Sequence, residues 1–529
     1  MGLWNLYFVF KLCLYFADLI DFHVWLNLAL ALALLLPLPA ARGWRWLRNA
    51  AALPVAVALL YHDTRFPPFQ RLTAQADMID QFSWNYLSEL LSRFINPGVA
   101  AACVAVLLIA LLAARKLRLS SFVLLAIFPL VPIHQYLKAR PQPQAEAAVA
   151  TAADGGQTTG IAPPGATGSP DNAALDQALA AFYKTQAARQ VTFSKPASGP
   201  DFDVVILQIC SMAWDDLQLA GLDKSGPLKR FDLLFRQFNT ATAYSGPAAI
   251  RLLRATCGQT PHSALYDPAA SSCLLFNQLA NAGFERQMLL NHDGVFGNML
   301  QEIQTYGGLN VPPIDTQGLP PLTQAFDGSI ILDDDAVLNH WLELRQRSPQ
   351  GKTALFYNTA SLHDGNHPVG TKSESSSAAG YAGRLQRLFA DLDKFFDQLE
   401  NSGRKVVLVM IPEHGADSRG DRMQIPFMRE NPSPAITLAP VGVRLFGLPR
   451  PAAAIDVPQP TSYIDLAGLL RDIIQQNPYA SGGPDARTLA SAIGSTPHVA
   501  ENEGSVVVRY GANYYIRYND SAWTDYQYR

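Results

Sequence analysis

The chain has 529 residues, of which 49% are hydrophobic and only 16% are charged, whereas about 25% of the residues of a soluble domain are usually charged. Its formal charge of −3 provides no basic surface for a polyanion, which argues against nucleic acid as a partner. The length exceeds what one hydrophobic core accommodates and predicts at least two separately packed regions.

Five apolar stretches in the first 136 residues approach the roughly 20 residues that cross a bilayer. They lie at about 3–20, 22–39, 46–61, 98–115 and 119–136. The third contains a short uninterrupted apolar run, which also fits a buried or interfacial helix. Two basic turns separate the second stretch from the third and the fourth from the fifth: Arg42, Arg45, Arg48 and Arg115, Lys116, Arg118. Both turns are predicted to be cytoplasmic, so that residues 1–138 form a membrane domain and the remainder lies outside.

Residues 139–172 are rich in Ala, Gly, Pro and Thr and almost free of large apolar side chains. Such a segment buries too little surface to fold, and we predict a flexible tether. A short helical stretch, 173–190, comes directly after it. Residues 173–529 have the length and composition of one large globular domain.

Three apolar runs in this domain end in polar residues. They are 203–209, which leads to Cys210; 353–357, which leads to Asn358 and His363; and 405–411, which leads to Glu413 and His414. Helical periodicity between them, as in 381–401, predicts an α/β domain with a mostly parallel sheet covered by helices. Ligands of such sheets bind at the carboxyl ends of the strands, where these polar residues fall.

Carboxylate, imidazole and thiolate groups converge in this prediction. Glu413, His414 and Cys210, together with a nearby hydroxyl, form a mixed set that suits zinc. Each residue alone is weak evidence for a metal site. Cys210 also fits core packing, and the run Glu413-His414-Gly415 also fits a capping or surface role. The group as a whole favours a metal site.

The hydroxyl comes from Tyr244-Ser245-Gly246-Pro247, which opens a helical stretch. Pro belongs in a first helical turn, so Ser245 is placed at a helix N-terminus, where backbone N–H groups favour a phosphate. A simple N-cap serine explains the same residues equally well.

The cysteines divide by region. Cys257 and Cys273 are 16 positions apart in the domain predicted to lie outside the cytoplasm, where a disulfide between them would persist. Cys13 and Cys103 lie in apolar stretches and need only be packing residues. Cys210 is left unpaired, and a metal would give its thiolate a use.

Long blocks of the sequence resemble the phosphoethanolamine transferases that act on bacterial cellulose, a divergent branch of the alkaline-phosphatase-like superfamily. They are the N-terminal GLWNLYFVFK region, TATAYSGPAAIRLLRATCGQT from residue 240, FYNTASLHDGNH and PEHGADSRGDRMQ. The resemblance runs nearly end to end. It implies a multi-pass protein of the bacterial inner membrane with its catalytic domain in the periplasm.

The same resemblance implies an active site. Zinc is then held by Cys210, Ser245, Glu413 and His414, with Ser245 as nucleophile, and Tyr244, His363 and Arg429 line the site. Phosphatidylethanolamine is the implied donor, the 6-hydroxyl of glucose in nascent cellulose the acceptor, and subunits of the cellulose synthase complex are the implied partners. His363 is our candidate acid and base.

Two other functions remain open from the sequence. A phosphodiesterase or sulfatase-like hydrolase of the same superfamily would need similar residues, although the sulfatase signature requires an arginine where this chain has Ala249. A noncatalytic membrane assembly subunit of the synthase would not need Ser245 or the metal ligands, all of which are present.

Overall fold

Two compact units make up the chain, one formed by the described residues up to 138 and the other by those from 160 onward. The computed structural model describes residues 4–17, 20–37, 42–64, 97–113, 119–138, 160–161, 170–196, 201–371, 378–519 and 521–528. Apart from 160–161 and 170–172, the predicted tether lies outside these residues.

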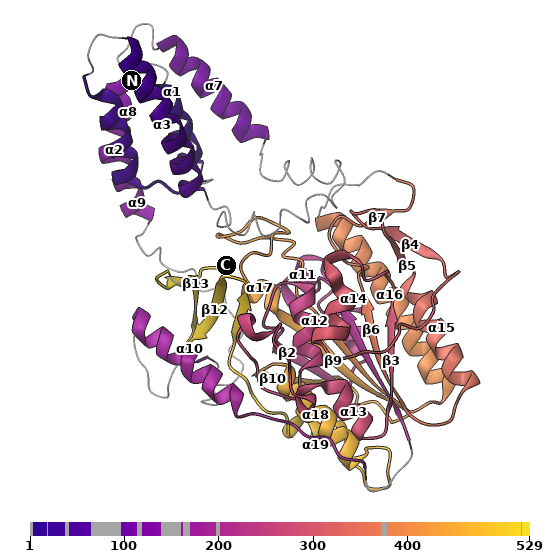
Figure 1. Ribbon diagram of the computed structural model, residues 1–529. Coiled ribbons are helices and arrows are strands. Elements are labelled where there is room, and N and C mark those ends of the chain that lie inside the picture. The colour runs from indigo at the N-terminus through magenta and orange to yellow at the C-terminus, as the bar shows by residue number, and fades with distance from the viewer. Residues whose placement is uncertain are drawn as a thin grey trace. The chain divides into compact units, whose positions relative to one another are not determined.

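The first unit is helical, and each of the five apolar stretches contains a helix (Figure 1). The helices are α1 (Trp4–Phe16), α2 (Val24–Leu35), α3 (Arg42–Asp63), α7 (Pro97–Ala113), α8 (Leu119–Leu125) and α9 (Val131–Lys138). A π-helical turn, Ala126–Leu130, joins α8 to α9. In the described part of the chain, no helix combines the length and apolarity needed to span a membrane.

A buried polar cluster lies within this apolar unit. The Lys11 ammonium contacts Asp63 Oδ2 at 2.8 Å and Asn27 Oδ1 at 2.8 Å, and all three side chains are buried. His23 Nδ1 lies 2.7 Å from the same aspartate. Burying a lysine and an aspartate is tolerated because each supplies the other's countercharge. This pair was not predicted from the sequence, because the stretches were recognised only by their apolar content.

A seven-stranded mixed sheet forms the centre of the second unit. Its order is β10-β2-β9-β8-β1-β6-β3. The strands are β1 (Asp203–Ile209), β2 (Leu233–Asn239), β3 (Glu285–Leu290), β6 (Thr353–Thr359), β8 (Val406–Pro412), β9 (Leu438–Phe446) and β10 (Ile455–Thr461). Only β9 runs antiparallel to its neighbours in this sheet, so the predicted mostly parallel arrangement holds for the other six.

Helices cover both faces of this sheet (Figure 1). The flanking helices are α11 (Trp214–Leu219), α12 (Ser245–Leu253), α13 (Leu275–Asn281), α15 (Asp334–Arg347), α16 (Ala378–Ser402), α18 (Tyr463–Gln476) and α19 (Ala486–Ser491). Alternate residues of β1 enter opposite cores: Val204 and Ile206 pack with the α12, α13 and α18 side, and Val205 and Leu207 with the α15 and α16 side. A strand buried on both faces explains the continuous apolar run.

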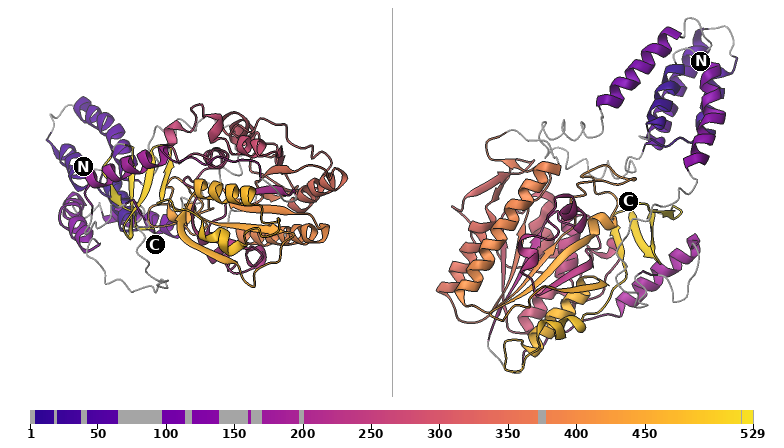
Figure 2. Two further views of the ribbon diagram at one scale, coloured as in Figure 1. Left: turned by 90° about the horizontal axis from the view of Figure 1, so that it is seen from below. Right: turned by 180° about the vertical axis from the view of Figure 1, so that it is seen from behind.

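Two smaller sheets flank the central one. β4 (Pro321–Gln324) pairs with β5 (Ile330–Leu332) and β7 (His367–Pro368). The C-terminal sheet contains β11 (Val499–Asn502), β12 (Ser505–Tyr510), β13 (Asn513–Tyr518) and β14 (Thr524–Asp525), and β12 and β13 form an antiparallel hairpin. It packs against α10 (Asn172–Ala187) through a separate apolar cluster (Figure 2).

The structure contains the Cys257–Cys273 disulfide, which closes a loop of 16 residues after α12. We expect its reduction to lower the free energy of unfolding by roughly 3 kcal/mol, because the unfolded chain regains the entropy of the open loop. Denaturant unfolding of the intact protein in detergent, with and without reductant, measures the difference. In the Cys257→Ala/Cys273→Ala variant, reductant is expected to change nothing; an effect of equal size there would contradict the prediction.

Candidate active site

The site begins where three neighbouring parallel strands end level with one another. In the pairing register, Ile209 of β1 lies opposite Thr359 of β6 and Pro412 of β8. The next residue on β1 is Cys210 and the next on β8 is Glu413, so the register brings thiol and carboxylate together. The three predicted strands end within two residues of β1, β6 and β8, and the residues at these ends set the chemistry of this edge.

Ser245 reaches the same place from α12. The helix begins at Ser245, and Tyr244 is the N-cap residue, so the N-cap interpretation of Ser245 is wrong. Its hydroxyl oxygen instead lies 3.2 Å from His414 Nε2 and 3.7 Å from Cys210 Sγ. A hydroxyl at the first position of a helix stands among free backbone N–H groups, where a phosphate is stabilised.

His414 is held in one tautomer. Its Nδ1 donates to the carbonyl oxygen of Gly415 at 2.8 Å, which leaves the Nε2 lone pair directed at Ser245. Burial, and then the charge of Arg429, hold the pKa of His414 well below its usual range. The imidazole is therefore neutral, the form that binds a metal.

Glu413 and Cys210 complete the cluster. Asn358 Nδ2 donates to Glu413 Oε1 at 2.6 Å, whereas Glu413 Oε2 is buried without a hydrogen-bond partner. Burial raises the pKa of Glu413, and burial followed by Glu413 raises the pKa of the Cys210 thiol to about 12. A carboxylate and a thiol that share a buried space without a cation are each driven toward the neutral form.

The cluster could hold a metal ion, and its donors are of the types that zinc accepts. The candidate ligand atoms of Cys210, Glu413 and His414 all lie within 4.8 Å of one another, and Glu413 Oε2 is 3.9 Å from His414 Nε2. Tetrahedral ligands at zinc bond lengths of about 2.0–2.3 Å stand about 3.2–3.8 Å apart. Ser245 Oγ, at 3.2 and 3.7 Å from two of them, lies within that range, and the distance between Glu413 and His414 lies just outside it. The unpaired carboxylate oxygen and the mixed S, N and O donors suit such a metal.

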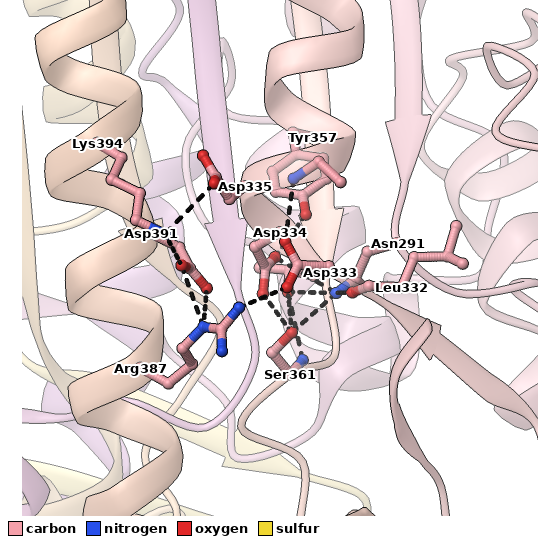
Figure 3. A network of polar contacts seen from close by, with 12 residues as sticks. Asn291, Leu332, Asp333, Asp334, Asp335, Tyr357, Ser361, Arg387, Asp391 and Lys394 are labelled. Carbon is pink, nitrogen blue, oxygen red and sulfur yellow. Dashed lines mark hydrogen bonds and ion pairs between the residues drawn. The ribbon is translucent and has the colours of Figure 1, made fainter. Parts of the chain in front are cut away.

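His363 lies after β6, and its loop is fixed by a buried polar network. Asp334 accepts hydrogen bonds from Ser361 and from the Tyr357 hydroxyl, and Asn291 donates to Ser361 at 2.8 Å (Figure 3). His363 Nδ1 donates to the Asp364 carbonyl oxygen at 2.7 Å, so Nε2 is the nitrogen left to exchange a proton. Burial, and then Arg429, lower the pKa of His363 to about 4.

Arg429 contacts His414, and Tyr244 lies beside Arg429. Arg429 Nη1 is 3.1 Å from His414 Nε2, and its guanidinium carbon is 6.0 Å from the centre of the Tyr244 ring. The Tyr244 hydroxyl donates to Glu430 Oε1 at 3.1 Å. The structure therefore brings together Cys210, Ser245, Glu413, His414, Arg429 and Tyr244, and it places His363 in the loop that follows β6.

Comparison with known proteins identifies the family. A model described as the cellulose biosynthesis protein BcsG C-terminal domain matches residues 161–523, and one for the BcsG N-terminal domain matches residues 4–131. The cellulose biosynthesis protein BcsG of Escherichia coli (strain K12) is 39% identical over 99% of this chain and 96% of that protein. The chain belongs to the BcsG family. The two BcsG models divide the chain where its two compact units divide.

The solved structures to which the chain is similar are more distant than these relatives in sequence. An alkaline phosphatase superfamily protein from Vibrio parahaemolyticus has a TM-score of 0.46 and 14% identity, covering 67% of this chain and 88% of that one. The integral membrane lipooligosaccharide phosphoethanolamine transferase A from Neisseria meningitidis has a TM-score of 0.42 and 13% identity, covering 92% and 98%.

Three residues of this BcsG-family site were missed or undervalued from sequence. Asn358 orients Glu413 through its hydrogen bond to Oε1. Asn502 of β11 accepts from the Ala243 backbone N–H at 3.0 Å and donates to the Arg429 carbonyl at 2.9 Å, which ties two active-site loops together. Asp216 joins the loops after β1 and β8. Only the position of Asn358 at a strand end was visible in the sequence; the other two lie in segments without a motif.

Asp216 offers a direct test of this scaffold. One of its oxygens accepts from the backbone N–H groups of Ala213 and Ala416, and the other accepts from the N–H and hydroxyl of Ser418. Asp216→Asn leaves two of these buried donors facing an NH₂ group, and we expect a loss of about 2–5 kcal/mol in unfolding free energy. Denaturant unfolding measures it.

The control for Asp216→Asn is Asp397→Asn on α16. The Asp397 side chain is 64% exposed and pairs with Arg230, so its loss is expected to cost less than about 1 kcal/mol. Equal costs for the two variants would show that the Asp216 contacts do not stabilise the loops.

Proposed function

We propose that this protein transfers a phosphoethanolamine group from phosphatidylethanolamine to glucose 6-hydroxyl groups of nascent cellulose through a covalent Ser245 intermediate. The observation that carries the proposal is the Ser245 hydroxyl at the start of α12, in contact with both Cys210 and His414. Membership of a family whose curated member is named for cellulose biosynthesis supports the acceptor. A mixed sheet with such a cluster at its strand ends is the arrangement expected of an alkaline-phosphatase-like enzyme.

Cys210, Ser245, Glu413 and His414 are the residues that would hold zinc. When bound, zinc supplies a Lewis acid that lowers the pKa of a hydroxyl and offsets charge on a phosphate oxygen. The backbone N–H groups at the start of α12 and the Arg429 guanidinium orient the phosphate so that its phosphorus faces Ser245 Oγ.

The chain's own groups account for the bonds and protons. Ser245 Oγ gives its proton to the free Nε2 of neutral His363 and forms a bond to phosphorus; as the bond to the diacylglycerol oxygen breaks, that oxygen takes the proton from Nε2. In the second half-reaction Nε2 takes the proton of the sugar hydroxyl, whose oxygen attacks phosphorus, and passes it to Ser245 Oγ as the bond between that oxygen and phosphorus breaks. In each half-reaction one proton therefore passes through His363 Nε2, from the attacking hydroxyl to the leaving oxygen.

Replacement of His363 tests this role. We expect His363→Gln to slow both adduct formation and adduct consumption by roughly 10²- to 10⁴-fold, the usual effect of losing a general acid or base. Single-turnover mass measurements track the two half-reactions separately. An effect on only one of them would assign His363 to substrate positioning.

We further propose the location that the reaction requires. The five helical stretches would anchor the chain in the bacterial inner membrane beside the lipid donor, with the catalytic unit in the periplasm and the synthase complex as partner. Reporter fusions after Pro141 are expected to give a periplasmic signal. A cytoplasmic signal would contradict the predicted number of spans.

The function itself is tested on the product. Solid-state NMR of cellulose made by cells with this protein is expected to show the phosphoethanolamine substituent, which is lost with Ser245→Ala. If unmodified cellulose accompanies release of free phosphoethanolamine, water is the acceptor and the protein is a phosphodiesterase. If neither appears, the noncatalytic assembly role gains support.

A further inference from the structure

A carboxylate outside the metal cluster lies beside the nucleophile. Glu302 begins a π-helical turn, Glu302–Tyr306, that runs alongside α12. The far end of this turn is fixed by Arg254, whose Nε donates to the Tyr306 carbonyl oxygen at 2.8 Å. Its near end is fixed at Gly246: a Cβ atom at that position would lie 1.5 Å from Glu302 Oε2. The carboxylate therefore occupies the space of a side chain at the residue next to Ser245.

Glu302 has unused hydrogen-bonding capacity. Its Oε2 atom is buried and has no hydrogen-bond partner. The Glu302 side chain does not cap α12: among the described residues, which include both Glu302 and Gly246, no hydrogen bond joins the two. Burial, and then the charge of Glu413, raise the pKa of Glu302 to about 7, which places it within electrostatic reach of the metal cluster. A carboxylate oxygen that is buried without a partner is costly, and a bound cation would remove that cost.

The group to be transferred supplies such a cation. Phosphoethanolamine carries one positive charge, a primary ammonium three bonds beyond the ester oxygen on phosphorus, with three N–H donors to satisfy. When phosphorus is bonded to Ser245 Oγ, the ammonium must lie close to the start of α12. Of the carboxylates there, Glu413 belongs to the metal cluster and Glu430 is engaged by Tyr244.

We propose that Glu302 binds the ammonium of the phosphoethanolamine group, on the donor lipid and again on the Ser245 adduct, and so selects ethanolamine over uncharged headgroups. This inference rests on the proposed function. It also gives a reason for glycine at position 246, since any side chain there would displace the carboxylate from the ammonium site.

The test compares two donors on the full-length protein in lipid vesicles. One is phosphatidylethanolamine and the other is phosphatidylethylene glycol, in which a neutral hydroxyl replaces the ammonium. The mass of the Ser245 adduct identifies the group transferred, and diacylglycerol release gives kcat/KM for each donor. Wild type is expected to prefer phosphatidylethanolamine by about 10- to 100-fold, the effect of a hydrogen bond to a charged group.

The variants are Glu302→Gln and the matched control Glu285→Gln. Glu302→Gln keeps the shape of the side chain and removes its charge, so kcat/KM for phosphatidylethanolamine is expected to fall by about 10- to 100-fold while that for the neutral donor is retained. Glu302→Asp is expected to restore part of the preference. Glu285 is exposed at the start of β3, far along the sheet from the strand ends, and Glu285→Gln is expected to keep the wild-type preference.

Each outcome decides the inference. An equal loss on both donors in Glu302→Gln would assign Glu302 to supporting α12 and overturn the inference, as would a preference that survives the substitution. A wild type that forms the adduct equally from both donors also overturns it, while the proposed function stands. A wild type that forms no adduct from phosphatidylethanolamine overturns the proposed function and this inference together.

Discussion

Replacing Ser245 with alanine is expected to abolish the phosphoethanolamine adduct and lower transfer by about 10⁴- to 10⁶-fold, the range seen when a nucleophile is removed. Ser245 Oγ is the atom that the start of α12 presents to His414 Nε2 and Cys210 Sγ. The adjacent Gly246 lacks a hydroxyl altogether, so no neighbouring residue on the helix can take over the attack on phosphorus.

The fold is expected to survive this substitution. Because Tyr244 occupies the N-cap position of α12, the Ser245 side chain does not cap the helix, and its loss should cost less than the about 1 kcal/mol of a capping serine. A large change in unfolding would mean that the activity loss has a structural cause.

Intact-mass analysis of the protein incubated with phosphatidylethanolamine and no sugar measures the adduct. Wild type is expected to gain the mass of one phosphoethanolamine group. The control variant Ser271→Ala is expected to gain the same mass, because this serine is exposed within the disulfide loop. An adduct that persists in Ser245→Ala would place the nucleophile elsewhere.

The central strands could be predicted from the sequence because their burial leaves a direct signature. A strand buried on both faces reads as one apolar run, and β1 coincides with the predicted 203–209, while β6 and β8 differ by a residue or two at their ends. The orientation of β9 has no such signature. Its run is apolar too, but the chain returns through residues 413–437 to pair with β8 in the antiparallel direction, and no local pattern in the strand records that direction.

The candidate site could be predicted only in part, because a buried strand marks only the residues that are next to it in the sequence. Residues directly after buried strands, such as Cys210 and Glu413, are located by the strand itself. Asp216 and Glu302 reach the site from a helix and a π-helical turn, and their partners are brought close only by tertiary packing. The Lys11–Asp63 pair was missed likewise, since 52 positions separate its members. Local sequence patterns carry no information on such contacts.

Loss of the Cys210 thiol is expected to remove zinc and transfer together. Cys210 Sγ lies 3.7 Å from Ser245 Oγ, directly after the central strand β1, so Cys210→Ala deletes the thiol donor of the cluster. Asn358→Ala keeps all four candidate ligands and removes the hydrogen bond to Glu413, together with those to Gln208 and His292. A group that orients a ligand typically contributes about 10- to 100-fold to metal affinity, and loss of the ligand itself is expected to cost more.

Zinc titration of the chelator-stripped protein, with bound metal measured by mass spectrometry, ranks the three forms. The expected order of affinity is wild type, Asn358→Ala and Cys210→Ala, and added zinc is expected to restore adduct formation in the first two. Cys13→Ala, in the helical unit, serves as the cysteine control and is expected to bind zinc like wild type. If Cys210→Ala binds zinc as tightly as wild type, the thiol is a packing group, and the metal must be held by other residues.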